Sequence, residues 1–185
     1  MPTAIMVVIA VVIVAILVAV GYLAWNQVRS QRLRSRFGPE YDRAVERHGG
    51  RGAAEKELRS REQRHQELDL HDLPDEQREL YREQWVHVQE RFVDTPEGAL
   101  EEADRLVLVV MGQRGYPTGG FEERAAHLSV EHGRTLDHYR RGHDISSRAA
   151  GKEASTEDMR QAMVHYRALF EDLLAVPVED RNPRS

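Results

Sequence analysis

Residues 4–25 read AIMVVIAVVIVAILVAVGYLAW, an uncharged stretch of 22 residues that precedes the first charged side chain, Arg29. A helix of this length spans roughly 33 Å at about 1.5 Å per residue, and the hydrocarbon core of a bilayer is about 30 Å thick. The stretch therefore predicts a transmembrane anchor, which we place at residues 1–28. The chemically varied part of the chain then lies on one side of a membrane.

A cleaved signal peptide is the competing interpretation of this N-terminus. Signal peptides start with basic residues, continue with an apolar core of about 7–15 residues and end at a small-residue cleavage site. In this chain no Lys or Arg precedes the apolar run, and the cleavage pattern at residues 19–21 lies inside it. We therefore expect the anchor to be retained.

The residues that flank the run predict its orientation. Aromatic rings favour the membrane interface, and basic residues favour the cytoplasmic flank. The first three residues, MPT, have no basic side chain, whereas residues 29–37 form a basic juxtamembrane segment. The expected membrane-interface residues are Tyr22, Trp25, Arg29, Arg32, Arg34 and Arg36. We expect a single-pass protein of the inner (plasma) membrane, with its N-terminus outside and its C-terminal domain in the cytoplasm.

The composition of the 185-residue chain narrows the function classes. The formal net charge is −5, which argues against nucleic acid as a partner because such binding needs a basic patch. The chain has no cysteine, so disulfide scaffolds and cysteine-ligated zinc are excluded. The lipid bilayer is the partner that the apolar run requires. Ala15 and Ala19 would let two anchors approach closely, so a homo-oligomer stays open, although small residues more commonly face lipid.

Apolar residues after the anchor recur at helical spacing almost throughout. The clearest stripe consists of Tyr81, Trp85, Val88 and Phe92, widened by Leu80 and Val93. Residues 54–68 keep the period but place polar residues on it, so we expect a largely solvated helix there. We predict an all-α fold, in which the transmembrane helix is followed by a bundle-like domain of about five to seven helices at residues 38–176 and a polar tail at 177–185.

Local signals place several helix ends. Thr95 and Pro96 are typical of an N-cap followed by a first-turn proline, and Ser155 with Asp158 is typical of a capping box. The run LVLVVM at residues 106–111 has the composition of a buried strand, but no partner strand is evident, so we expect a helix. The glycine-rich GQRGYPTGG at 112–120 predicts a loop.

Nine histidines raise the question of a metal site. Glu62 and His65 form the only Glu-x-x-His pair, and paired copies are what a helical metal site needs. A spacing of five or six residues distributes the later histidines around a helix: His127, His132, His138 and His143. Nucleophile-elbow, phosphate-loop and dinucleotide patterns are absent from the sequence. We therefore expect no metal ligands, no cofactor and no catalytic residues.

One part of the sequence gathers aromatic and arginine side chains, the residue types that anchor protein interfaces. The candidate interaction surface consists of Tyr116, Phe121, His138, Tyr139, Arg140, Arg141 and His143. The alternative is that a compact helical domain uses the same residues to pack a loop against its neighbour.

Five stretches carry a resemblance to other proteins. They are RFGPEYDRAVE (36–46), AEKELRSREQRH (54–65), QWVHVQERFVDTPEGALEEADRLV (84–107), RGYPTGGFEERAAHLSV (114–130) and RQAMVHYRALFEDLL (160–174). With the apolar N-terminus they resemble a group of actinobacterial single-pass membrane-anchored helical proteins with no known activity. The resemblance covers nearly the whole chain and implies this architecture alone, with no substrate and no catalytic residue.

These features predict a membrane-tethered, non-enzymatic interaction or scaffold protein whose helical domain binds another protein near the inner leaflet. The first alternative is an enzyme with an unfamiliar helical site that uses His138, His143 or His165 with nearby acids. The second is a stress-response factor on the outer face of the membrane, which would follow from a reversed topology.

Overall fold

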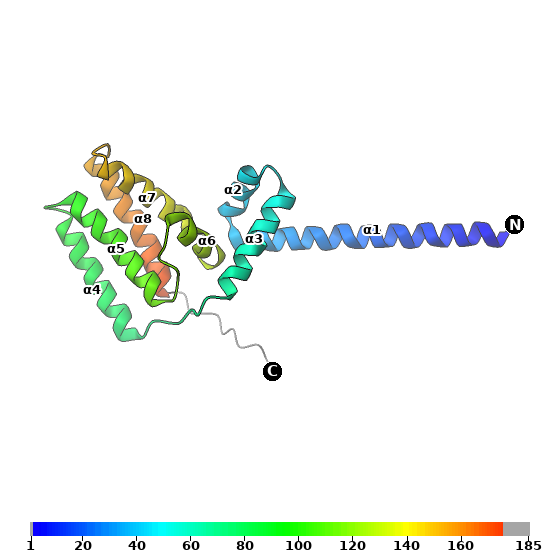
Figure 1. Ribbon diagram of the computed structural model, residues 1–185, viewed down its shortest axis with the longest axis horizontal. Coiled ribbons are helices and arrows are strands. Elements are labelled where there is room, and N and C mark those ends of the chain that lie inside the picture. The colour runs from blue at the N-terminus through cyan, green and yellow to red at the C-terminus, as the bar shows by residue number, and fades with distance from the viewer. Residues whose placement is uncertain (1, 176–185) are drawn as a thin grey trace.

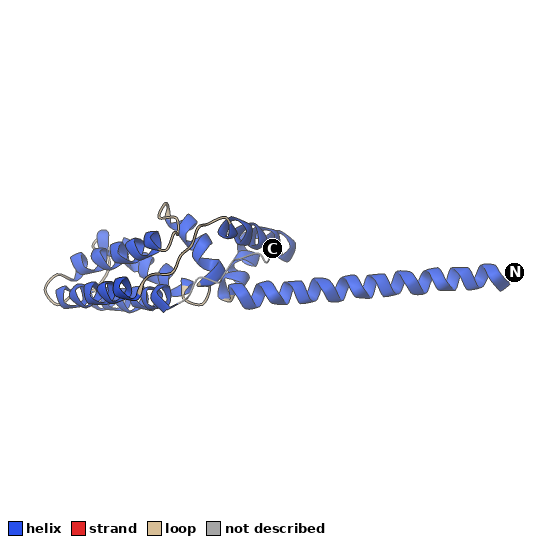
Figure 2. Cartoon of the chain, turned by 90° about the horizontal axis from the view of Figure 1, so that it is seen from below, coloured by secondary structure: helices blue, strands red, loops and turns tan. Residues whose placement is uncertain are grey.

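The computed structural model describes residues 2–175, and every regular element in that range is a helix (Figure 2). The N-terminal helix α1 runs over Pro2–Phe37 and stands out from the rest as a straight rod (Figure 1). The helices that follow are α2 (Pro39–His48), α3 (Arg51–Gln66), α4 (Asp75–Arg91), α5 (Pro96–Gln113), α6 (Phe121–Glu131), α7 (Leu136–Ala150) and α8 (Thr156–Ala175). The prediction of an all-α fold with an N-terminal apolar helix and a packed helical domain is confirmed.

Helix α1 is long and apolar enough to cross a membrane. Within Ile13–Phe37, the most apolar 18-residue window has a mean hydropathy of 1.3, and none of that window is buried in the protein. Signal sequences can have the same length and composition. The helix continues without a break through the basic segment 29–37 and ends at Phe37, next to Gly38 and the first-turn proline of α2.

The domain has two apolar cores. The larger core lies among α4, α5, α7 and α8, where the rings of Trp85 and Phe170 stack with centroids 4.8 Å apart. The smaller core joins the end of α1 to α2, α3 and α6, and it consists of Leu33, Phe37, Tyr41, Ala44, Ala54, Leu58 and Val130. The last turns of α1 are therefore part of the folded domain.

Several local predictions are confirmed. Residues 106–111 lie within α5, and Leu106, Val107, Val110 and Met111 are buried there. The backbone N–H of Ser155 donates to Asp158 Oδ2 at 2.9 Å, and that of Asp158 donates to Ser155 Oγ at 3.1 Å, so the predicted capping box begins α8.

Residues 114–120 of the glycine-rich segment form a loop between α5 and α6, whereas the first two residues of the predicted loop, Gly112 and Gln113, still belong to α5. Gly115 adopts a φ of 86°, and a Cβ at this position would lie 2.2 Å from the carbonyl oxygen of Asp69. Only glycine fits such a close approach, which holds this loop against the segment between α3 and α4.

Other local predictions are wrong. Leu80 is 50% exposed and Val93 is 83% exposed, so they do not widen the apolar stripe of α4. Thr95 does occupy the predicted N-cap position of α5, with Pro96 after it, but its hydroxyl donates to the carbonyl of Arg91 and makes no cap hydrogen bond. Helix α3 is less solvated than predicted, since Arg61 and His65 are buried along its apolar seam. The predicted tail at 177–185 lies outside the described residues.

Candidate functional site

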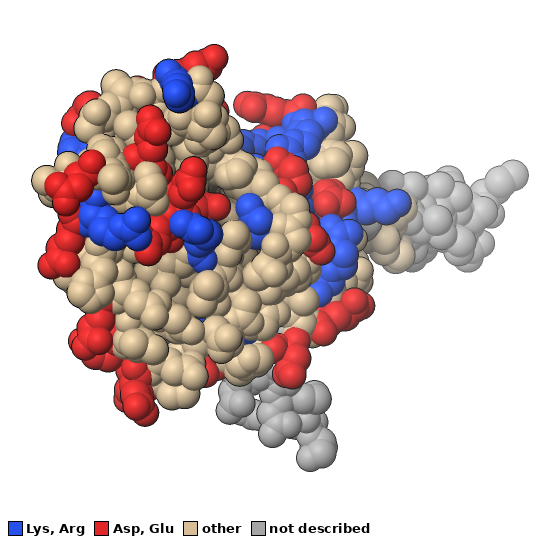
Figure 3. Space-filling view, turned by 60° about the vertical axis from the view of Figure 1, so that its left-hand side comes forward, with Lys and Arg blue, Asp and Glu red and all other residues tan. Residues whose placement is uncertain are grey.

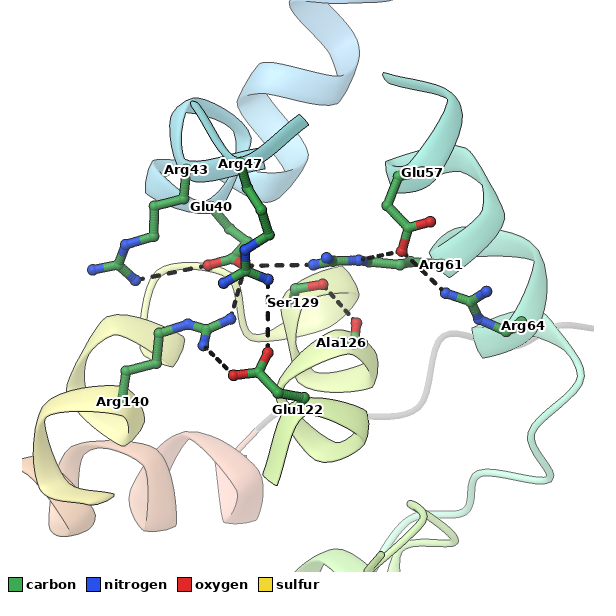
Figure 4. Close-up of polar contacts among 10 residues, drawn as sticks. All are labelled: Glu40, Arg43, Arg47, Glu57, Arg61, Arg64, Glu122, Ala126, Ser129 and Arg140. Atoms are coloured by element: carbon green, nitrogen blue, oxygen red, sulfur yellow. Dashed lines mark hydrogen bonds and ion pairs between the residues drawn. The ribbon is translucent and has the colours of Figure 1, made fainter. Parts of the chain in front are cut away.

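A buried carboxylate connects α2 and α3 to the bundle. Glu40, in the first turn of α2, is only 2% exposed. It accepts a hydrogen bond from Arg140 of α7 at 2.9 Å and one from Arg61 of α3 at 3.4 Å, and Arg43 lies 3.7 Å from its second oxygen. Figure 4 shows the three guanidinium groups converging on Glu40. We call these four residues the Glu40 hub.

A second polar network crosses the same junction, and we call it the histidine–carboxylate chain. His65 Nε2 of α3 lies 3.0 Å from Glu131 Oε1 at the end of α6, and the hydroxyl of Tyr116 donates to Glu131 Oε2 at 2.6 Å. The Tyr116 oxygen also lies 3.2 Å from His132 Nε2. His132 Nδ1 in turn lies 2.8 Å from Asp172 Oδ2 of α8. The chain therefore links α3, the loop after α5, α6 and α8.

The electrostatics of the chain favour ionised carboxylates. Burial would raise the pKa of Glu131, but its hydrogen bonds with His65 and Tyr116 and the nearby imidazoles lower it to about 2. Burial also opposes ionisation of Asp172, yet His132 and Thr135 lower its pKa. The pKa of His127, whose ring centroid lies 6.2 Å from that of His65, is lowered by burial and by His65.

Both networks have the features of structural contacts between helices. A general acid or base must reach a substrate within hydrogen-bond distance. His65 is 1% exposed and His132 is 1% exposed, and the carboxylates beside them already accept hydrogen bonds from protein groups. Within residues 2–175 there is also no group of three or more acidic or histidine side chains with the geometry of a metal site. The networks hold α2 and α3 against α6, α7 and α8.

A mainly apolar surface cavity lies between α4 and α8, and we call it the α4–α8 groove. Its volume is about 330 Å³, and its lining consists of Gln89, Phe92, Arg160, Met163, Val164 and Arg167. Val164 is 50% exposed. Arg160 on its rim pairs with Glu157 at 2.7 Å, which compensates its charge. The apolar floor is therefore the main feature of the groove.

A shallow depression of about 330 Å³ lies on the surface of α7 and α8. Its lining consists of Arg140, Arg141, Asp144, Ile145, Arg148 and His165. His138 Nδ1 lies 3.0 Å from His165 Nδ1, and burial together with His138 lowers the pKa of His165. The arginines already have carboxylate partners: Arg141 pairs with Asp137 and Arg148 with Asp144.

The structure separates the residues of the predicted interaction surface. Tyr116 is 3% exposed and Tyr139 is fully buried, so these two are not surface residues. Both side chains point into the core because each ring packs there and each hydroxyl has a hydrogen-bond partner. The hydroxyl of Tyr139 accepts a hydrogen bond from Arg124 Nε at 2.9 Å. Burial raises the pKa of Tyr139 to about 12.

The other predicted residues lie nearer the surface but not together. Phe121 and His143 are half-buried and stack with ring centroids 4.0 Å apart. His138 and Arg141 border the α7–α8 depression, whereas Arg140 belongs mainly to the Glu40 hub. What remains of the predicted surface is therefore the exposed side of α7.

The predicted membrane-interface residues lie along α1. Trp25 is 66% exposed, and the guanidinium carbon of Arg29 lies 5.9 Å from the centre of its ring. Arg34 pairs with Asp42 at 3.1 Å, and Arg36 pairs with Glu62 at 3.4 Å. The side chain of Tyr22 lies outside the described part of the structure.

Sequence reasoning singled out Arg140, Tyr116, His65 and His132 for other roles, and it missed the carboxylates that connect them. Glu40, Glu131 and Asp172 look like ordinary charges on charged helices. One signal was present: Arg61 and His65 continue the apolar period of Ala54 and Leu58, and polar residues on a buried stripe need buried partners.

Comparison of the chain with protein-family models, with curated proteins and with solved structures finds no match. The functional conclusion therefore rests on the sequence and on the geometry described above.

Proposed function

We propose that the protein is a membrane-tethered, non-enzymatic interaction protein. In this proposal α1 is a retained anchor in the inner (plasma) membrane, with the N-terminus outside and the helical domain in the cytoplasm. The observation that supports it best is the continuity of α1, whose described apolar side chains between Ile13 and Val28 are exposed and whose Leu33 and Phe37 are buried in the domain. The resemblance to actinobacterial membrane-anchored proteins implies the same architecture.

The α4–α8 groove supports the interaction half of the proposal. Apolar floors with polar rims are typical of surfaces that bind protein segments. In Figure 1, α4 is the helix of the domain that lies on the side away from α1, so a partner on it would not meet the membrane. The bundle face in Figure 3 otherwise shows acidic and basic residues interspersed.

Affinity capture of the full-length protein from native membranes tests this function. The control is an anchor-only chain of residues 1–37, and the variant Val164→Glu places a charge in the groove. Val109→Glu is the matched variant, because Val109 on α5 is 48% exposed and does not line the groove. We expect a partner that the full chain and Val109→Glu retain and that Val164→Glu loses. Equal capture by the anchor alone would contradict the proposal.

The topology has its own test. A reporter fused after Ser185 that is active only in the cytoplasm should be active, since the basic segment follows the apolar run. Activity only of a reporter that works outside the cell would support the outer-face alternative.

A second candidate function is an enzyme that acts at the α7–α8 depression. The observation that favours it is the contact of His138 with His165 beside three arginines, a combination that would suit an anionic substrate. His143 is stacked on Phe121 and takes no part in this depression. Turnover of a phosphorylated or carboxylated substrate that is lost in His165→Ala, with an unchanged unfolding midpoint, would support this candidate over the first.

A further inference from the structure

Helix α3 crosses α1 close to the apolar part of the rod. The hydroxyl of Ser30 donates to Glu55 Oε1 at 2.7 Å, and the hydroxyl of Tyr41 donates to the same oxygen at 2.9 Å. Glu55 is buried, so this contact fixes the height of α3 along α1. Ser30 follows Trp25 by five residues, which is about 7.5 Å of helix.

That height corresponds to the headgroup layer of a bilayer. The polar layers add about 5–7 Å to each side of the hydrocarbon core, and aromatic rings such as Trp25 favour its boundary. In Figure 1 the first turn of α3 is the part of the domain that lies nearest the N-terminal part of α1. Arg51 and Lys56 of this end of α3 are exposed.

These two residues and two arginines of α1 share a second property. Among the described residues, no carboxylate forms an ion pair with Arg29, Arg32, Arg51 or Lys56, and all four are exposed. Their basic neighbours are paired, since Arg34 pairs with Asp42, Arg36 with Glu62 and Arg59 with Glu55. The exposed carboxylate nearby that has no ion partner is Glu46, so the excess charge of this region is positive.

We propose that Arg29, Arg32, Arg51 and Lys56 form a basic collar that binds anionic lipid headgroups where α1 leaves the membrane. This inference rests on the proposed anchoring of α1. Arg29 and Arg32 share a face of α1 that lies away from Ser30, so together with α3 the basic groups lie on two opposite sides of the helix. Such a collar would seat the whole domain on the membrane surface and fix its tilt.

A single fluorescent label on the full-length protein tests the collar. The chain has no cysteine, and a Cβ at Gly52 would meet no atom within 4 Å, so Gly52→Cys provides one labelling site next to Arg51. The labelled protein is reconstituted in nanodiscs of phosphatidylcholine, with or without phosphatidylglycerol. The measurement is quenching of the label by a lipid with a spin-labelled headgroup.

We expect quenching to be at least about twofold stronger in the anionic nanodiscs and to fall towards the neutral value at about 1 M salt, where the screening length is about 3 Å. The double variant Arg51→Gln/Lys56→Gln should lose most of the difference. The matched variant Arg105→Gln/Lys152→Gln removes the same charges from exposed positions elsewhere in the domain and should keep it.

Four results would overturn the proposal. Equal quenching in both lipids would show that the collar does not recognise lipid charge. An unchanged lipid difference in Arg51→Gln/Lys56→Gln would show that other residues bind the anionic headgroups. Salt-sensitive binding of an acidic polyglutamate peptide without any lipid effect would show that the collar binds an acidic protein segment and not lipid. Failure of the protein to stay in either nanodisc would overturn the anchoring itself, and that result is distinguishable because no label would then co-elute with lipid.

Discussion

Glu40 and Arg61 are buried at the junction of α2, α3 and α7 although both are charged. A buried ion pair adds little to stability by itself, because desolvation offsets the attraction between its partners. Its loss on one side is costly, because a charge then remains buried without a partner. Glu40 is 2% exposed and Arg61 is 6% exposed, so the Glu40 hub belongs to this class. At the scale of single residues, the junction therefore depends on complete sets of partners.

The substitution Glu40→Gln should destabilise the domain by about 1–3 kcal/mol, because Arg61 and Arg140 lose their shared carboxylate while Arg61 keeps Glu57 and Arg140 keeps Glu122. Urea unfolding of the full-length protein in detergent measures the change. Asp42→Asn is the matched control: its pair with Arg34 is exposed, with 59% of each side chain accessible, and should contribute at most about 1 kcal/mol. Equal effects of the two substitutions would show that the Glu40 hub does not stabilise the junction between α2, α3 and the bundle.

The histidine–carboxylate chain predicts an acid-sensitive fold. The pKa of Glu131 is lowered from 4.5 to about 2, so its contribution to stability is complete above 4.5 and is lost as the pH falls from about 4.5 to about 2. The urea midpoint should fall over this range. Glu131→Gln should have a lower urea midpoint at neutral pH, and its midpoint should fall less between pH 4.5 and pH 2. Glu76→Gln, at an exposed position, should behave like the unmodified protein. An identical pH profile for Glu131→Gln would contradict the assignment.

At the scale of helices, the sequence predicts best where neighbours in the chain decide the outcome. The capping box of Ser155 and Asp158 and the loop at Gly115 follow from local chemistry. Leu80 and Val93 were wrongly assigned to the buried stripe, because a helical period does not show how much of a helix surface the neighbouring helices cover. The buried polar junction was not predictable, because its partners come from distant parts of the chain: Arg140 and Glu40 are 100 residues apart.

Ser155 and Thr95 together test the geometry of the helix caps. Ser155→Ala should cost about 1 kcal/mol, because the Ser155 hydroxyl accepts a hydrogen bond from the free N–H of Asp158. Thr95→Ala should cost a few tenths, about 0.5 kcal/mol at most, because Thr95 satisfies no N–H of α5. The free energy of unfolding of each variant measures the difference. A larger loss for Thr95→Ala would mean that it caps α5 after all.

The attachment of α1 to the domain depends on Phe37, which is fully buried in the smaller core. Phe37→Ala should destabilise the domain by about 3–5 kcal/mol through lost burial and the cavity left behind. Val93→Ala, at a position that is 83% exposed, should change stability by less than about 0.5 kcal/mol. Thermal unfolding measures both variants, and a small effect of Phe37→Ala would show that α1 is not packed into the domain.

At the scale of the whole molecule, two apolar cores and two polar networks make the end of α1 and the bundle one folded unit. The sequence predicted the rod and the helical domain because both depend on runs and periods of apolar residues. It did not predict that the rod enters the core, since Leu33 and Phe37 stand among basic residues. In the proposed anchoring, this rigid connection holds the domain at a fixed height above the membrane.

The measurement that tests the central claim most directly is the intact mass of the protein extracted from carbonate-washed native membranes. Retention of α1 predicts a membrane-bound species with the full mass of 21.2 kDa. A shorter, soluble species that begins just after the small-residue pattern at 19–21 would contradict it. That result would identify the apolar run as a cleaved signal sequence.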